Sequence, residues 1–340
     1  MRRSILAFLI INIIVIGFLL HSVWTLLSLL VVDGSDQAIL PQELPSPKAG
    51  KGSNRPDLIP KIIHQTYIND SIPEVWKGAQ KSCKDLHKDY EYKLWTDKKA
   101  RDFIYTEYPW FLDTFDNYPY NIQRADAIRY FVLAHYGGIY IDLDDGCNRR
   151  LDPMLGYPAW LRRTVPTGIS NDAMGAVPNH PFFTKTIHEL ARYDRSWLLP
   201  YITVMASTGP LFLSIMWRHY MNTKPKLGEE VKILFPPEYQ GHSWSFFTHH
   251  KGNSWHQGDV QLIFWLGQNW IFVTAMGFAL AFLIYFFVYL CYTRNSQQDK
   301  VPRKDPRSRS RSRSPRRRGF FWWNRPQQQG YELVENRLEV

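Results

Sequence analysis

Residues 123–146 read QRADAIRYFVLAHYGGIYIDLDDG, and this stretch decides the fold. Apolar residues recur at helical spacing from Asn121 to Tyr136, and the diglycine that follows is typical of a helix end. The triplet IYI, which ends at Ile141, predicts a short buried strand that runs into a group of acidic residues. A helix followed at once by a buried strand is the repeating unit of an α/β sheet.

The same alternation extends to both sides of this stretch. Residues 59–64 and 90–95 predict two further strands, and residues 98–108 predict a helix that Pro109 ends. Residues 197–217 are apolar but contain Pro200, Gly209 and Pro210, which favours a strand, a turn and a helix over one membrane span. The sequence therefore predicts one α/β domain over residues 59–260.

The acidic group is the main candidate for chemistry. Asp142 and Asp144 are two residues apart at the end of the predicted strand, so they point the same way as long as the chain stays extended. Carboxylate oxygens in such a place are good ligands for Mg²⁺ or Mn²⁺, which keep room for substrate phosphates. An Asp-x-Asp triplet alone is weak evidence, but here it follows a buried strand and a diglycine. Asp145 is next to the motif and less favoured as a direct ligand.

Two other groups of residues have both an ordinary and a functional interpretation. Asp126 and Arg129 lie on one helix face, either as an ion pair within the helix or as part of a site. Residues 249–256 read HHKGNSWH, whose imidazole and hydroxyl groups could complete a metal site and whose Trp255 indole could donate to a phosphate oxygen. The alternative for this run is an interfacial belt of aromatic and histidine side chains beside a membrane.

The charge of the chain is concentrated at one end. The net charge is +10, but eleven of the 41 basic residues and one of the 31 acidic ones lie between Lys300 and Arg325, which leaves 30 of each elsewhere. The Arg-Ser repeats of residues 293–340 predict a disordered tail. Such repeats also occur in RNA-associated proteins, but a neutral body and two apolar spans argue against nucleic acid as a partner.

Two apolar segments predict transmembrane helices, at residues 4–32 and 268–292. Arg2 and Arg3 precede the first span, and Arg294 and the basic tail follow the second, so both termini are expected in the cytosol and the body in the lumen. Residues 33–58 are rich in Pro, Gly and Ser, which predicts a flexible stem. Residues 1–3 are then a short cytosolic N-terminus.

Two covalent features stay open at this point. Asn69-Asp70-Ser71 is a glycosylation sequon in the part expected to be lumenal, and sequons also occur by chance. Cys83 and Cys147 could form a disulfide, but three cysteines are too few for a disulfide framework and the sequence gives no geometry.

The sequence resembles glycosyltransferase family thirty-two, the sugar transferases with an Asp-x-Asp motif. The matching stretches are IPKIIHQTY from Ile59 to Tyr67, the run of residues 123–146 and the late SWH of residues 254–256. This resemblance spans residues 58–256, about three-fifths of the chain. It implies a GT-A fold, transfer from a nucleotide-sugar with retention of configuration, and dependence on Mn²⁺.

The resemblance also implies roles for single residues. Asp142 would contact the nucleotide-sugar and Asp144 would bind the metal; Asp126 and Arg129 would hold the donor sugar; Ser254 and Trp255 would close over metal and diphosphate, with His256 a further ligand; and Ile62, Ile63, His64 and Gln65 would line the nucleotide base. These assignments are expectations carried over from the family pattern.

Within the family the chain is most similar to the inositol phosphoceramide mannosyltransferases, in size and in its second membrane span. The resemblance implies GDP-mannose as donor, inositol phosphoceramide as acceptor, a Golgi membrane and a regulatory membrane subunit. With both ends tethered, the late motif lies about fourteen residues before the second span, which places the site near the bilayer and favours a lipid acceptor. An N-glycan or glycoprotein acceptor is the alternative, and a catalytically silent membrane subunit is another.

Overall fold

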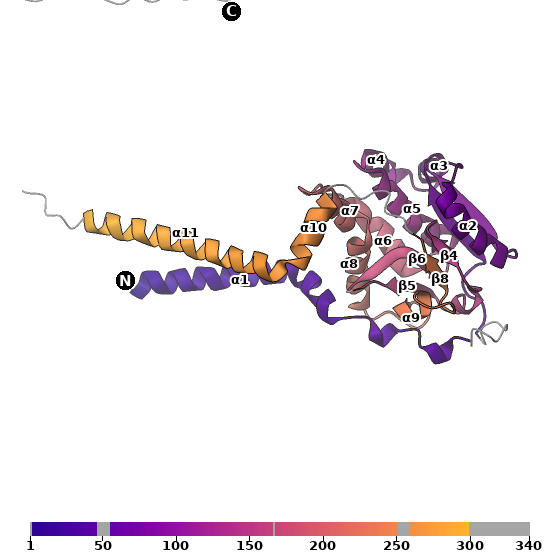
Figure 1. Cartoon of the computed structure of the whole chain (residues 1–340), viewed down its shortest axis with the longest axis horizontal. Coiled ribbons are helices and arrows are strands. Elements are labelled where there is room, and N and C mark those ends of the chain that lie inside the picture. Colours follow the sequence, from indigo (N-terminus) through magenta and orange to yellow (C-terminus); the bar gives the residue numbers. More distant parts are fainter. Residues whose placement is uncertain (1, 46–54, 166, 251–258, 299–340) are drawn as a thin grey trace, which may run out of the picture. The chain divides into compact units, whose positions relative to one another are not determined.

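The computed structural model describes residues 2–45, 55–165, 167–250 and 259–298. It divides into two compact units, Met1–Gln268 and Asn269–Val340. The first unit contains a mixed α/β body (Figure 1), so the predicted fold class is confirmed. The second unit contains helix α11, Trp270–Gln298. The tail that the sequence predicts to be disordered lies, from residue 299 onwards, outside the described residues.

A six-stranded sheet organises the body, in the order β2-β1-β3-β6-β5-β7. β1 is parallel to β2 and β3, β6 is antiparallel to β3 and β5, and β7 is parallel to β5. A separate two-stranded sheet pairs β4 with β8. The strands are β1 Ile62–Tyr67, β2 Glu91–Thr96, β3 Gly138–Ile141, β4 Asp145–Cys147, β5 Ala159–Arg163, β6 Ile169–Ala176, β7 Val231–Leu234 and β8 Phe247–His249.

Helices cover the sheet, and α5 and α8 both contact β6. The α-helices of the first unit are α1 Arg2–Val31, α2 Glu74–Leu86, α3 Asp97–Glu107, α4 Leu112–Asn117, α5 Asn121–Tyr136, α6 Pro181–Tyr193, α7 Pro200–Ser207, α8 Pro210–Met221, α9 Pro236–Tyr239 and α10 Asp259–Gln268. The short 3₁₀ helices are η1 Ser35–Gln37, η2 Pro41–Glu43, η3 Pro109–Phe111 and η4 Asp152–Met154.

The core lies on both faces of the sheet, as strand β3 illustrates. Ile139 and Ile141 pack into one hydrophobic cluster, whereas Tyr140 packs into the other. This is the period-two alternation of a strand covered on both sides. Helix α5 is also buried nearly all round, because every residue from Asp126 to Ala134 is buried, so it is a core helix and not a surface one.

The predicted end of α5 at the diglycine is confirmed. The helix stops at Tyr136, and the next two residues have φ angles of 64° and 95°. A Cβ atom at Gly137 would lie 2.7 Å from Pro178 and 2.8 Å from the carbonyl oxygen of Ala176. Glycine is therefore required here, both for the left-handed backbone and for the close approach that lets the chain turn from α5 into β3.

Two expectations about the rest of the body are wrong. Residues 200–207 form helix α7 and not a strand, because Pro200 stands at the first helical position, where its fixed φ suits a helix. Part of the expected flexible stem, residues 33–45, is packed on the body. Ile39 is 2% exposed and its N–H donates to the Ile233 carbonyl at 2.9 Å, and Leu44 is buried in the same core cluster. Stem residues 46–54 lie outside the residues that the structure describes.

Two described helices are long and apolar enough to cross a membrane. The spans are Ile10–Val31 within α1 and Trp270–Arg294 within α11, with mean hydropathies of 2.3 and 2.4. The last turns of α1 are docked on the body, because Thr25 lies 3.4 Å from His219 and Arg218 donates to Ser28 at 3.2 Å. Leu29 is buried in the main core cluster. The end of α1 therefore contacts helix α8.

A disulfide joins Cys83 of α2 to Cys147 of β4, with Cα atoms 4.7 Å apart. Both cysteines are buried, and α2 packs along β4. The sequence left this pairing open, because 64 residues separate the two cysteines and only the fold brings them together. The bond fixes α2 beside the strand that begins with Asp145.

We expect the Cys83→Ser variant to lose about 4 kcal/mol of unfolding free energy, because the disulfide closes a long loop and reduces the entropy of the unfolded chain. Thermal unfolding of the full chain in detergent measures the loss. Cys291→Ser is the matched control, because Cys291 is an exposed free thiol. Equal unfolding midpoints for the two variants would contradict the stabilising role of the disulfide.

Candidate active site

The acidic motif lies where the main sheet passes into the two-stranded sheet. The N–H of Asp142, just after β3, donates to the Asp172 carbonyl at 2.8 Å. The chain then turns through Leu143 and Asp144, and the N–H of Asp145 donates back to the Asp142 carbonyl at 3.1 Å as β4 begins. The extended geometry assumed from the sequence therefore ends at Asp142. As a result the two predicted acids have different surroundings.

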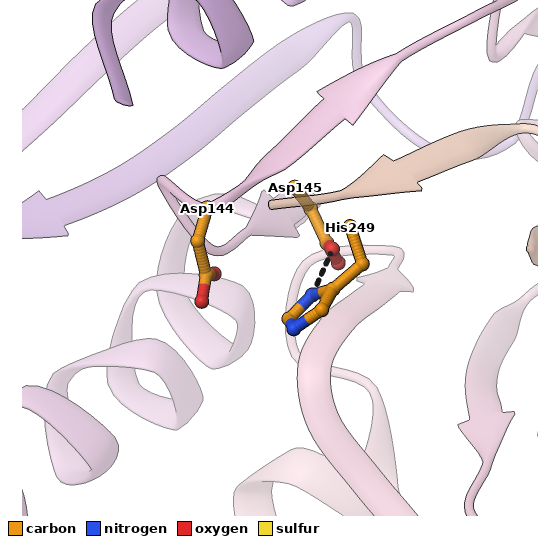
Figure 2. A group of neighbouring side chains, drawn as sticks. All are labelled: Asp144, Asp145 and His249. Carbon is orange, nitrogen blue, oxygen red and sulfur yellow. Dashed lines mark hydrogen bonds and ion pairs between the residues drawn. The ribbon is translucent and has the colours of Figure 1, made fainter. Parts of the chain in front are cut away.

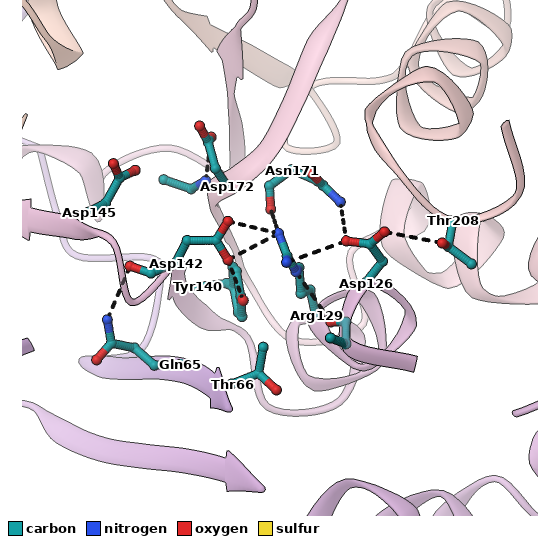
Figure 3. A network of polar contacts seen from close by, with 12 residues as sticks. Gln65, Thr66, Asp126, Arg129, Tyr140, Asp142, Asp145, Asn171, Asp172 and Thr208 are labelled. Atoms are coloured by element: carbon teal, nitrogen blue, oxygen red, sulfur yellow. Dashed lines mark hydrogen bonds and ion pairs between the residues drawn. The ribbon is translucent and has the colours of Figure 1, made fainter. Parts of the chain in front are cut away.

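Asp142 is held by a cation and a phenol. The Arg129 guanidinium lies 3.1 and 3.2 Å from its two carboxylate oxygens, and the Tyr140 hydroxyl donates to it at 2.7 Å (Figure 3). Arg129 also donates to the Asn171 carbonyl at 2.9 Å. Since Arg129 and Tyr140 reach Asp142 from α5 and β3, they fix the direction of its carboxylate.

Asp126 contacts Arg129, and both of its carboxylate oxygens have polar partners. Asn171 donates to one of its oxygens at 2.9 Å, Thr208 donates to the other at 3.1 Å, and Arg129 lies 3.4 Å away (Figure 3). The Asp126 side chain is 5% exposed. The ion pair within the helix, which was the ordinary interpretation, is present. The pair is also part of a buried network that links α5, β6 and the end of α7.

Burial dominates the electrostatics of these acids. Burial raises the pKa of the Asp142 carboxyl, Arg129 opposes that rise, and the nearby Asp144 and Asp172 add to it. Burial likewise raises the pKa of Asp144, and the charge of Asp145 raises it further. Negative charge gathered in a partly desolvated place is relieved by a bound cation, so the arrangement favours cation binding.

Asp144, Asp145 and His249 form a compact cluster (Figure 2), in which one ligand atom of each residue lies within 4.8 Å of the others. His249 Nδ1 lies 2.9 Å from an oxygen of Asp145. The other oxygen of Asp145 pairs with Arg162, and both Asp145 and Arg162 are buried. This hydrogen bond leaves His249 Nε2 free to accept, as in carboxylate–histidine pairs that support a metal ligand.

The donor set fits a divalent metal. Asp144 offers a half-buried carboxylate for which the described residues supply no hydrogen-bonding side chain, and His249 offers a ring nitrogen on the same side (Figure 2). Oxygen ligands with one imidazole suit Mn²⁺ and also permit Mg²⁺. Asp145 is already occupied by Arg162 and His249, so it orients the histidine and is not itself an available ligand.

A cavity of about 610 Å³ opens beside the motif. Its wall comes from the end of β1, the start of α5, the acidic turn, α7 and α10. The lining residues include Thr66, Tyr67, Ile68, Trp76, Arg129, Asp142, Asp144, Pro200, Tyr201, Val204, Asp259 and Val260. This volume is in the range of small-molecule and cofactor sites.

The residues expected to line the nucleotide base do not reach this cavity. Ile63 and His64 are interior, and the imidazole of His64 bonds to the Gly137 carbonyl at 2.8 Å. Gln65 is also buried, but its amide donates to the Asp142 carbonyl at 3.3 Å and so helps to hold the backbone of the acidic motif (Figure 3). The next three residues, 66–68, line the cavity instead, because β1 emerges from the sheet there.

The late group Ser254, Trp255 and His256 lies outside the described residues. The sequence indicated that imidazole groups of the run HHKGNSWH could reach a metal site, but it did not single out His249, the first residue of that run. The pairing of β8 with β4 sets Asp145 opposite His249, and this contact could not be read from the chain.

Comparison with known proteins gives relatives over most of the chain. Mannosyl phosphorylinositol ceramide synthase SUR1 of Saccharomyces cerevisiae is 49% identical over 294 residues, which are 86% of this chain and 76% of that protein. Inositol phosphoceramide mannosyltransferase 2 of Schizosaccharomyces pombe is 52% identical over 230 residues, 67% of each chain. A family model described as a glycosyltransferase sugar-binding region containing the DXD motif matches residues 73–160. Among solved structures, the PaToxG glycosyltransferase has 17% identity and a TM-score of 0.38, over 50% of this chain and 72% of that one.

The match to the DXD sugar-binding model and the relatives over most of the chain show a glycosyltransferase, and the mixed α/β sheet with an acidic motif at a strand end agrees with that class. The resemblance found in the sequence is confirmed by the relatives. The chain belongs to the DXD sugar-transferase family, with the fungal inositol phosphoceramide mannosyltransferases.

Proposed function

We propose that the chain transfers mannose from GDP-mannose to inositol phosphoceramide, with retention of configuration, to form mannosylinositol phosphoceramide. The observation that carries this proposal is the identity of about half of the aligned residues to proteins named for that product or acceptor, over most of both chains. Those names describe the relatives. The geometry adds a nucleotide-sized cavity with an acidic cluster at its wall.

Asp144 and His249 would hold the divalent ion, Mn²⁺ or Mg²⁺, and Asp145 would orient the histidine. When bound, the ion offsets the negative charge that develops on the leaving diphosphate. We also propose Ser254 and His256 as further ligands of this ion. Asp142, whose direction Arg129 and Tyr140 fix, would contact the nucleotide-sugar.

The donor would lie along the cavity. Tyr67 and Trp76 line it, with ring centroids 5.8 Å apart at 81°, and present aromatic surface for the nucleotide base. Arg129 reaches the wall and can donate to the sugar or diphosphate, while Asp126 positions Arg129 from behind. Trp255 would close over the diphosphate. These residues would bind and orient the donor, and such positioning lowers the barrier to transfer.

The topology is part of the same proposal. Residues 59–260 would form the lumenal catalytic domain of a Golgi membrane protein, residues 4–32 and 268–292 would cross the bilayer, and both termini would be cytosolic. A regulatory membrane subunit would join the complex. A lumenal body is consistent with the disulfide between Cys83 and Cys147, because disulfides persist in oxidising compartments.

An acceptor competition tests the function. Detergent-solubilised full chain is given GDP-mannose with Mn²⁺ present or chelated, and inositol phosphoceramide and a high-mannose N-glycan are offered together. We expect metal-dependent product on the lipid alone. Product on the glycan alone would move the function to glycoprotein processing, and no transfer or donor hydrolysis at all would support the silent-subunit alternative.

We expect His249→Ala to raise the Mn²⁺ concentration needed for half-maximal transfer at least tenfold, because it removes a ligand nitrogen that Asp145 holds in place. A titration of transfer rate against Mn²⁺ measures the change. His242→Ala is the control, because His242 stacks on Trp244 at 4.8 Å and is not part of the cluster. An unchanged Mn²⁺ requirement would remove His249 from the metal site.

A further inference from the structure

One wall of the cavity is built by two helices, α7 and α10. Pro200, Tyr201 and Val204 of α7 line the cavity together with Asp259 and Val260 of α10. The N–H of Tyr201 donates to a carboxylate oxygen of Asp259 at 2.7 Å, which ties the two helices together. Val260 is buried, whereas most of α10 beyond it faces outward.

Large apolar side chains are exposed along the outside of this wall. Leu198, in the loop before α7, is 98% exposed, and its neighbour Trp197 is 54% exposed. Leu262, Phe264 and Trp265 on α10 are about half exposed. Two adjoining elements that both expose such residues are unusual on a soluble surface, where apolar patches of this kind mark an interaction site.

The covalent chain indicates what covers this surface. Only Asn269 separates the end of α10 from Trp270, the first residue of the α11 span, so α10 stays close to any membrane that α11 crosses. The other span, in α1, is docked on α8, which follows α7 after two residues. Tryptophan is enriched at the membrane–water interface, and this surface has Trp197 and Trp265.

We propose that Trp197, Leu198 and the outward face of α10 form a membrane-contact surface. It lies in the headgroup region of the bilayer, as amphipathic surface helices do. Because the other side of the same wall lines the cavity, an acceptor headgroup anchored in the bilayer reaches Asp144 along α7 and α10. The membrane contact does not depend on the proposed function, whereas the acceptor route rests on it.

Depth-dependent fluorescence quenching tests the contact directly. Leu198→Cys and Phe264→Cys, each in a Cys291→Ser background, are labelled with an environment-sensitive fluorophore and reconstituted as full chain in phosphatidylcholine vesicles. Tyr105→Cys is the control, because Tyr105 is 63% exposed on α3, at the other end of the body from α10 (Figure 1). We expect lipids with a spin label near the headgroup to quench positions 198 and 264 at least twofold more than position 105. Equal quenching at all three positions would overturn the proposal and assign the surface to a protein partner.

The acceptor route has its own test. We expect Leu198→Glu to lower transfer to inositol phosphoceramide in vesicles about tenfold, because a charge replaces an apolar contact with the bilayer. Hydrolysis of the donor, measured as GDP release without acceptor, should stay at the wild-type rate, because Leu198 does not line the cavity. An equal loss of both reactions would mean that Leu198 supports the fold, which overturns the route. A wild-type chain with neither transfer nor GDP release would count against the proposed function, and the quenching result would still decide the membrane contact.

Discussion

The Asp144→Asn variant should lose at least about 10³-fold of its transfer rate. The substitution keeps the shape of the side chain but removes the carboxylate charge at the centre of the cluster with Asp145 and His249. Stabilisation of a leaving diphosphate by a bound cation is worth several kcal/mol, and each 1.36 kcal/mol is tenfold in rate. Transfer from GDP-mannose under saturating Mn²⁺ measures the loss.

The same variant should fold and insert normally. Asp144 is half-buried in a turn, and the described residues give its carboxylate no side-chain partner that the change would leave unpaired. Asp102→Asn, on the exposed face of α3, is the matched control and should retain full activity. Near wild-type transfer by Asp144→Asn would show that the metal assignment is wrong.

Arg129→Met should lower the unfolding free energy by about 3–5 kcal/mol, because it leaves the buried carboxylate of Asp126 and the partly buried carboxylate of Asp142 without their cation. Arg129 lies 3.4 Å from Asp126 and 3.1 Å from Asp142, and it is 6% exposed. A loss of this size corresponds to a fall of about 10 °C or more in Tm for a body of this length. Transfer should also be lost, because Asp142 is no longer oriented. Thermal unfolding of the full chain gives the first result.

The control for this variant is another Arg-to-Met change. Arg101 pairs with Asp116 through two hydrogen bonds of 2.9 and 2.7 Å, but half of its side chain is exposed. Exposed pairs contribute only about 0–1 kcal/mol, so Arg101→Met should shift Tm by no more than a few degrees. If the two variants lose the same stability, the buried network does not hold the site together.

Local sequence signals predicted the elements that depend on local physics. The helix that ends at Tyr136 and the strand that ends at Ile141 follow from apolar spacing and from a diglycine that permits positive φ. The acidic residues after that strand were therefore located correctly at the edge of the sheet. The two helices that are long and apolar enough to cross a membrane followed equally from length and composition.

Features that depend on distant contacts could not be predicted. The turn at Asp144 separates the two acids because Asp145 pairs with Arg162 and with His249, which lies 104 residues further along the chain. The stem composition around Ile39 resembles a linker, yet a parallel bridge to Ile233 holds it on the body. Such contacts form only when the sheet assembles, so the hydrophobic periodicity of the sequence does not predict them.

Residues 63–65, which were expected to line the nucleotide base, do not line the cavity, for a related reason. The family pattern marks the β1 strand as a whole, but only its end leaves the sheet. His64 is buried and bonds to the Gly137 carbonyl, whereas Tyr67 lines the cavity. Which residues of a strand reach a site depends on where the neighbouring strands stop, and this is a property of the fold.

Direct measurement of Mn²⁺ binding tests the central claim, that Asp144 and His249 hold a divalent ion at the wall of a nucleotide-sugar cavity. Electron paramagnetic resonance of free Mn²⁺ can follow binding to the purified full chain in the presence of GDP. We predict one tight site in the wild type, a weakening of at least tenfold in His249→Ala, and no detectable tight site in Asp144→Asn. Equal Mn²⁺ affinity in all three proteins would contradict the account.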